Sequence, residues 1–137
     1  TDMFTDFDRL EVPQSPNTWL VAPAGMAGGQ ADAEAEVLKV PARHLAAAWQ
    51  AVVAQADRAR VTATSPDGLQ IEAEQRSALF GFVDDISFRA LPLGEDQSTF
   101  ITYSRSRVGY WDLGVNQRRL NAWLAAMRQR LGDGRGS

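Results

Sequence analysis

The chain has 137 residues, of which 45% are hydrophobic and 23% are charged, as in one ordinary globular domain. Its formal net charge of -3 argues against nucleic-acid binding driven by overall charge. The absence of cysteine excludes disulfides, thiolate metal sites and cysteine nucleophiles, and a single histidine excludes a histidine metal cluster. We therefore expect neither a metal site nor a cofactor.

The two ends of the chain differ in composition from its middle. Prolines and glycines interrupt any regular period in residues 1–33, so we expect an irregular N-terminal arm that packs on the domain. Residues 34–131 form the predicted single domain, and the small, polar residues 132–137 are typical of a flexible tail. The chain begins with Thr1 and not with methionine, so we expect a processed or trimmed form. Whether a membrane tether has been lost ahead of residue 1 stays open.

The first predicted elements are a strand, a helix and a hairpin. The strand is expected over residues 34–40. A helix follows over about 41–57, because its apolar residues recur at spacings of three and four. Residues 65–68 read Ser-Pro-Asp-Gly, a sequence typical of a tight turn between two antiparallel strands. In the second of these strands the polar residues alternate with apolar ones, and we expect that they face solvent: Gln70, Glu72 and Glu74.

Two more strands, over residues 80–91 and 99–108, and a helix over about 116–131 complete the chain. Consecutive strands with short links pair most easily as antiparallel neighbours. The order strand, helix, four strands, helix therefore predicts an α+β fold. It has a single antiparallel sheet of about five strands, with both helices packed on one face.

The hairpin formed by residues 80–91 and 99–108 carries an unusual mixture of aromatic, acidic and basic residues. If its loop is symmetric, Phe80, Phe82 and Asp84 point to the core, and Asp84 lies directly opposite Arg105. A buried carboxylate is costly alone and tolerable beside a guanidinium, so we predict an ion pair between them. It is open whether this pair is structural or functional, and a slip of one residue in register would undo the prediction.

The start of the last predicted helix is the second unusual feature. Arg118 and Arg119 fall in its first turn, where cations oppose the helix dipole. They reach either to acidic side chains and water, or to an anion bound at the helix N-terminus. The candidate anion-binding residues are Arg107, Asn116, Arg118 and Arg119.

The same stretch carries a family resemblance. The run Phe82-Val83-Asp84-Asp85 and the run from Ser104 to Arg119, which reads SRSRVGYWDLGVNQRR, resemble the bacterial and plant family of domain of unknown function 1499. The resemblance extends over nearly the whole domain. It implies no established activity, cofactor or catalytic residue. It does imply membrane association in the full-length form, and hence the cell envelope or periplasm.

Three functions stay open at this point. We favour a non-catalytic binding or interaction module at the bacterial cell envelope, with a small anionic ligand as its candidate partner. The first alternative is an enzyme that uses Asp84 or Asp85 as a base with nearby arginines. The second is a structural partner domain of a membrane protein. The sequence identifies no catalytic residue, predicts no nucleic-acid partner and does not indicate an oligomeric state.

Overall fold

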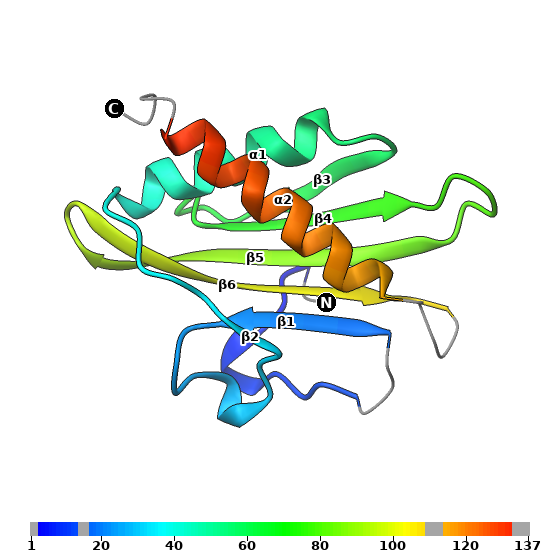
Figure 1. The fold of residues 1–137 in the computed structure, drawn as a ribbon, viewed down its shortest axis with the longest axis horizontal. Coiled ribbons are helices and arrows are strands. Elements are labelled where there is room, and N and C mark those ends of the chain that lie inside the picture. Colours follow the sequence, from blue (N-terminus) through cyan, green and yellow to red (C-terminus); the bar gives the residue numbers. More distant parts are fainter. Residues whose placement is uncertain (1–2, 14–16, 109–113, 133–137) are drawn as a thin grey trace.

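The computed structural model describes residues 3–13, 17–108 and 114–132, and contains one six-stranded sheet with two α-helices on one of its faces (Figure 1). This confirms the predicted α+β class, with one strand more than expected. The regular elements are η1 (Phe7–Arg9), β1 (Thr18–Ala22), η2 (Ala27–Gly29), β2 (Ala33–Glu34), α1 (Ala42–Gln55), β3 (Ala59–Thr64), β4 (Gln70–Arg76), β5 (Val83–Gly94), β6 (Gln97–Ser106) and α2 (Val115–Gly132).

The strand order is β2-β1-β6-β5-β4-β3. Strands β3 to β6 form the antiparallel meander that short links favour, and β1 adds antiparallel to β6 while β2 runs parallel to β1. The expected strand over residues 34–40 is therefore reduced to β2. Farther along that segment, Leu38 makes only an isolated bridge with Ser98.

Strand β1 lies in the segment expected to be an irregular arm. Its run Trp19-Leu20-Val21 is apolar on both sides, because Leu20 packs on one face of the sheet and Val21 on the other. A continuous apolar run is typical of a strand that is covered on both faces. The prolines around it end the strand but do not prevent it. Of the expected tail, Gly132 ends α2, and residues 133–137 lie outside the described part of the chain.

The main core lies between the helices and the sheet. Trp49 of α1 stacks on Phe88 of β5 with a centroid separation of 4.5 Å, and Trp123 of α2 meets its edge at 5.7 Å. A smaller cluster covers part of the opposite, helix-free face. There Leu20, Ala22, Ile101 and Tyr103 pack against apolar residues of the N-terminal segment, which are Phe7, Leu10, Val12 and Met26. These residues of the N-terminal segment lie over β1 and β6.

The register of the β5–β6 hairpin differs from the expected one by a single residue. The pairing shifts between Pro92 and Gly94, so Asp84 lies opposite Ser106, and Arg105 lies opposite Asp85. This irregularity in the loop makes the hairpin asymmetric, and a slip of one residue moves every later side chain to the other face. Asp84 therefore faces the helices, whereas Arg105 faces away from them.

Two further expectations about this sheet were wrong. Phe80 and Phe82 do not enter the core: strand β5 begins only at Val83, and the two side chains are 70% and 52% exposed in the β4–β5 connection. The polar residues of β4 are not solvent-facing either. Gln70, Glu72 and Glu74 are buried, because the N-terminal segment and neighbouring arginines cover them.

The β3–β4 turn forms as predicted and is held by Asp67. The Gly68 N–H donates to the Ser65 carbonyl at 2.8 Å, and Gly68 has a φ of +76°, which glycine adopts without strain. Asp67 accepts hydrogen bonds from Arg89 at 2.8 Å, from the Ser65 hydroxyl and from the Leu69 N–H. These contacts, with Arg89 first, lower the pKa of Asp67.

We expect the stability contributed by Asp67 to depend on pH. Its folded pKa lies below the unfolded value, so its contribution is complete above the ordinary aspartate pKa of about 4 and is lost as the pH falls towards the folded value. Asp67→Asn should cost about 1 kcal/mol or less at pH 7, because the pair with Arg89 is solvent-exposed. Denaturant unfolding at several pH values should show that the free energies of unfolding of Asp67→Asn and the native protein become more similar as the pH falls.

The matched control is Arg89→Gln, which removes the cation and keeps the carboxylate. The free energy of unfolding that this variant loses should also be smaller in acid than at pH 7, because Arg89 is the largest cause of the lowered pKa of Asp67. This account would be contradicted if the free energies of unfolding of the native protein and Asp67→Asn differed by the same amount at neutral and at acid pH.

Candidate functional site

The charged residues singled out in the sequence separate into two groups on opposite faces of the sheet. The first group lies under the start of α2 and is called here the buried arginine cluster. It comprises Asp84, Ser104, Ser106, Asn116 and Arg119. The second group lies on the helix-free face and is described after it.

Arg119 is the centre of the buried arginine cluster, and only 7% of its side chain is exposed. Its Nη2 donates to Asp84 Oδ2 at 2.6 Å, and its Nη1 donates to Ser104 Oγ at 2.9 Å and to Asn116 Oδ1 at 2.7 Å. Its Nε donates to Gln75 Oε1. The guanidinium thus has a partner on each of its three nitrogens and binds α2 to β4, β5 and β6.

Asn116 extends this cluster to β1. Its side chain is fully buried, and Nδ2 donates to the carbonyl of Asn17 at 2.9 Å and to Ser106 Oγ at 3.0 Å. Helix α2 begins one residue earlier, after Gly114, which has a φ of +80°. A Cβ at position 114 would lie 3.2 Å from Nη1 of Arg118, so glycine suits this start in both conformation and space.

The structure does not bring the four candidate anion-binding residues together. Asn116 and Arg119 belong to the buried arginine cluster and are bound to one another. Arg118 is exposed on α2, and Arg107 lies on the other face of the sheet. The predicted pair of Asp84 with Arg105 does not form, because the shifted register places them on opposite faces, and Asp84 binds Arg119 instead.

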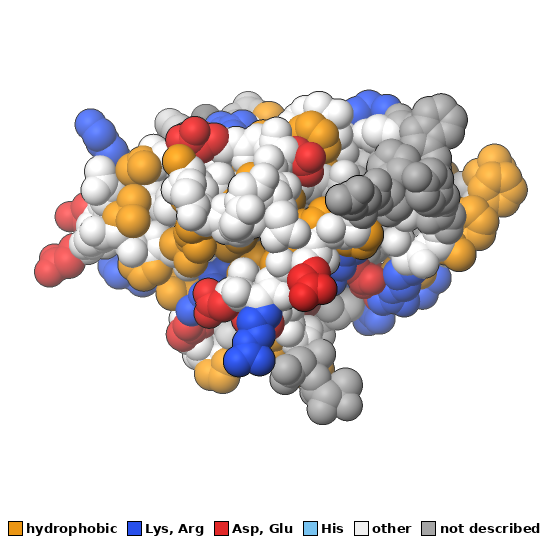
Figure 2. Space-filling view, turned by 90° about the horizontal axis from the view of Figure 1, so that it is seen from below, with side chains coloured by type: hydrophobic (Ala, Val, Ile, Leu, Met, Phe, Trp, Pro, Cys, Tyr) orange, Lys and Arg blue, Asp and Glu red, His pale blue; other side chains and the backbone are white. Residues whose placement is uncertain are grey.

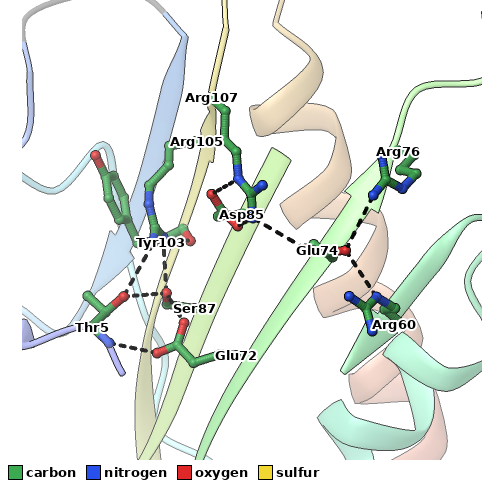
Figure 3. Close-up of polar contacts among 10 residues, drawn as sticks. All are labelled: Thr5, Arg60, Glu72, Glu74, Arg76, Asp85, Ser87, Tyr103, Arg105 and Arg107. Atoms are coloured by element: carbon green, nitrogen blue, oxygen red, sulfur yellow. Dashed lines mark hydrogen bonds and ion pairs between the residues drawn. The ribbon is translucent and has the colours of Figure 1, made fainter. Parts of the chain in front are cut away.

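The second group is the helix-free-face cluster, which Figure 3 shows from the side without helices. One half of it centres on Glu74, whose side chain is 9% exposed and which accepts from Arg60 at 3.0 Å and from Arg107 at 3.3 Å. Arg107 also forks onto both oxygens of Asp85, at 2.7 and 2.8 Å. Asp85, and then Glu74, raise the pKa of Arg107. The carboxylates here are therefore already neutralised within the protein.

The other half of the cluster centres on Glu72 and Thr5. Glu72 accepts from the backbone N–H of Thr5 at 2.8 Å and from the hydroxyl of Ser87. The Thr5 carbonyl accepts from Gln70 Nε2 at 2.8 Å, and the Thr5 hydroxyl lies 2.6 Å from that of Ser87. The N-terminal segment is therefore held at Thr5 by the backbone N–H, the carbonyl and the side chain. Figure 3 shows the contacts of the N–H and of the hydroxyl.

Arg105 lies between these two halves, and its hydrogen-bond partners among the described residues are neutral. It donates to Ser87 Oγ at 3.0 Å, to the Tyr103 carbonyl at 3.4 Å and to Thr5 Oγ1 at 3.3 Å. Its guanidinium also lies over the Tyr103 ring, 4.9 Å from the centroid. Burial raises the pKa of Tyr103, and Arg105 opposes that rise. No carboxylate of the described residues lies within ion-pair distance of Arg105.

A cavity of about 350 Å³ adjoins this cluster. Its lining includes Phe4, Thr5, Glu72, Arg105 and Arg107. A larger cavity of about 640 Å³ lies elsewhere, between the ends of α1, α2 and β4, and is lined by Val52, Trp123 and Arg130 among others. Of the two, the smaller one is lined by several carboxylates and guanidinium groups, which are Glu72, Glu74, Asp85, Arg105 and Arg107. It is the candidate ligand site.

Sequence reasoning missed this site for two reasons. It assigned Glu72 and Glu74 to solvent, although alternating acids on a strand beside alternating arginines on its neighbours could have indicated a charged layer. It also gave no role to Thr5, because contacts across 67 and 82 residues leave no periodic signal in the sequence.

Within residues 3–13, 17–108 and 114–132, no three histidine or acidic side chains come together as metal ligands would. In the same ranges, no helix combines the length and the apolar character that a membrane crossing requires.

The buried arginine cluster makes a specific energetic prediction. Because both side chains are nearly buried, removing one partner leaves the other charge unpaired, which costs about 3–5 kcal/mol. We expect Asp84→Asn and Arg119→Gln to be strongly destabilising singly. Together they should cost less than the sum, by about 0.5–3 kcal/mol, when measured by denaturant unfolding.

The matched cycle combines Asp84→Asn with Arg105→Gln. These two side chains lie on opposite faces and share no partner, so their effects should add to within about 0.5 kcal/mol. A coupling of Asp84 to Arg105 that equals its coupling to Arg119 would show that the register described here is not the one in solution.

Comparison with known proteins agrees with the resemblance noted in the sequence. Neither the curated proteins nor the solved structures include a match to this chain. The model of one family matches residues 10–127, which include β1, α1, most of α2 and every residue of the buried arginine cluster. The chain belongs to the family described as protein of unknown function (DUF1499).

Proposed function

We propose that the protein is a non-catalytic binding module of the bacterial cell envelope, and that it holds a small anionic ligand at Arg105. The observation that supports this most strongly is the set of partners of Arg105, which are all neutral. A half-buried guanidinium usually has an anionic partner, and a carboxylate or phosphate can accept two parallel hydrogen bonds from it. The contact of 3.3 Å to Thr5 Oγ1 is long, so a ligand oxygen that replaces it would form a shorter and stronger hydrogen bond.

The surroundings of Arg105 narrow the class of ligand. Glu72 lies on the other side of Ser87 and accepts an N–H from Thr5, so the site favours a ligand that has N–H donors as well as an acidic group. An amino acid or a short peptide has both. The cavity of about 350 Å³ is at the small end of the range for ligand sites, which suits a ligand of this size.

The envelope location is supported by the family resemblance alone. The resemblance to this family implies membrane association in the full-length form. The proposal places this domain in the periplasm or at a membrane surface, where small peptides and amino acids are available to a binding module.

The alternative functions have less support. Asp84 and Asp85 each bind an arginine, which stabilises the charged carboxylate but also occupies the oxygens that a general base needs. The contacts of the buried arginine cluster fit a structural role, because they join α2 to β4, β5 and β6 and, through Asn17, to the start of β1. A structural partner domain of a membrane protein would account for that cluster, but it would not account for Arg105.

The ligand proposal can be tested by thermal unfolding with a panel of L-amino acids, dipeptides, acetate and inorganic phosphate. A ligand present at a hundred times its Kd stabilises the folded state by about 2.7 kcal/mol. We expect at least one amino acid or dipeptide to raise the Tm of the native protein. Arg105→Gln should raise the Kd of that ligand about tenfold or more, since it removes a charged hydrogen-bond donor.

The control is Arg89→Gln, which removes an arginine from the same face of the same sheet, outside the cavity lining. Its Tm should rise with the ligand as much as that of the native protein. Equal ligand shifts in Arg105→Gln and in the native protein would show that Arg105 does not bind the ligand, and the proposal would then fail.

A further inference from the structure

The connection between β4 and β5 is a second unexplained surface. Residues 77–82, called here the aromatic tip, extend beyond the end of the sheet (Figure 1). The tip has an ordered backbone: the Ser77 N–H donates to the Phe82 carbonyl at 2.9 Å, and the Phe82 N–H donates to Ser77 Oγ at 3.1 Å. Gly81, with a φ of +68°, allows the chain to turn there.

The side chains of the aromatic tip are apolar and solvent-exposed. Leu79 is 80% exposed, Phe80 is 70% exposed and Phe82 is 52% exposed. The two phenylalanine rings stack on each other with centroids 5.4 Å apart, which leaves their outer faces to solvent. Figure 2 shows this hydrophobic patch at the same end of the molecule as the β4–β5 connection of Figure 1. The domain itself gains no core burial from these side chains.

Arginines surround the base of the aromatic tip. Arg76 Nη1 donates to the Gly81 carbonyl at 3.4 Å, and Arg58 Nε donates to the Arg76 carbonyl at 3.0 Å. Arg60 and Arg107 lie on the neighbouring strands, and their side chains are 70% and 53% exposed. The carboxylates among them are Glu74 and Asp85, so cations outnumber anions here in a chain whose net charge is negative. The positive charge is therefore local to this end of the sheet.

From these observations we infer that the aromatic tip inserts into the surface of a lipid bilayer that contains anionic headgroups. Apolar side chains beside a basic rim are the combination that binds such an interface, with the apolar groups at the acyl boundary and the cations at the phosphates. A protein partner is a poorer fit. Three side chains on a narrow projection bury far less than the roughly 800 Å² per partner of a stable protein interface.

This inference goes beyond the ligand site, because it concerns a different surface and its test needs no ligand. Failure of vesicle binding would leave the Arg105 proposal untouched, and absence of a ligand shift would leave the tip untouched. The shared consequence is an orientation. A domain bound by its tip would have the sheet end with β3, β4 and the start of β5 next to the membrane.

The test is co-sedimentation of the protein with vesicles at low salt. One vesicle preparation contains phosphatidylglycerol with phosphatidylethanolamine, and the other contains phosphatidylcholine alone. We expect binding to the anionic vesicles, weaker binding to phosphatidylcholine, and a loss of binding as salt screens the headgroups. The double substitution Leu79→Ser and Phe80→Ser should lower the partition coefficient about tenfold or more, because both side chains would otherwise leave water.

The control for the tip is Leu93→Ser. Leu93 is also an exposed apolar residue in a hairpin connection, at 52%, but its neighbours Glu95 and Asp96 are acidic. It should bind vesicles as the native protein does. Arg58→Gln together with Arg76→Gln should weaken binding to the anionic vesicles about tenfold or more, and should change binding to phosphatidylcholine little.

The Tm of each variant without vesicles distinguishes the loss of the binding surface from unfolding of the domain. The tip side chains are exposed, so their substitution should leave the Tm nearly unchanged. Three results would overturn the inference: no binding of the native protein to either vesicle, undiminished binding by the folded tip variant, or equal binding to both vesicle types. A protein partner recovered with a tip-dependent interaction and no vesicle binding would also replace the bilayer as the occupant.

Discussion

The fold depends on one buried guanidinium. Arg119 has been removed from water, so its N–H groups need acceptors inside the protein, and β4, β5, β6 and α2 itself supply four of them. The cluster therefore fixes the position and rotation of α2 on the sheet, and Asn116 adds β1. Four residues of the pattern that carries the family resemblance meet at this point, Ser104, Ser106, Asn116 and Arg119, whereas Arg107 lies on the other face.

The division of charge between the two faces follows from a single irregularity. The shift between Pro92 and Gly94 sends Asp84 to the helix side, where Arg119 neutralises it, and sends Asp85 and Arg105 to the other side. On that side Asp85 takes Arg107 as its partner, which leaves Arg105 with neutral groups. Without this shift, the pairing of Gly94 with Gln97 would continue along the hairpin and place Asp84 opposite Arg107. The availability of Arg105 for a ligand is therefore a consequence of the register of one hairpin.

Sequence patterns predicted the parts of the fold that depend on local periods. The apolar spacing of α1 and α2 and the Ser-Pro-Asp-Gly turn gave both helices and the β3–β4 hairpin, and short links gave the antiparallel meander. Three features had no local signal: the bulge that sets the β5–β6 register, the pairing of β1 with β6, and the contact of Thr5 with Glu72 across 67 residues. The first is a property of loop geometry, and the other two are long-range contacts. The expectation that Phe80 and Phe82 are core residues was wrong. An aromatic side chain can pack in the core or lie exposed on the surface, and its residue type does not distinguish the two.

Arg107 touches both proposed surfaces, since it lines the small cavity and lies among the arginines near the aromatic tip. Its charge is largely neutralised by Asp85, which takes two hydrogen bonds from it, and by Glu74. It therefore contributes little attraction to a ligand or to a headgroup. The effective cation of the cavity is Arg105, whereas those of the tip are Arg58 and Arg76, whose described contacts include backbone carbonyls. The two surfaces are adjacent in space but depend on different charges, so each can be removed by substitution while the other stays intact.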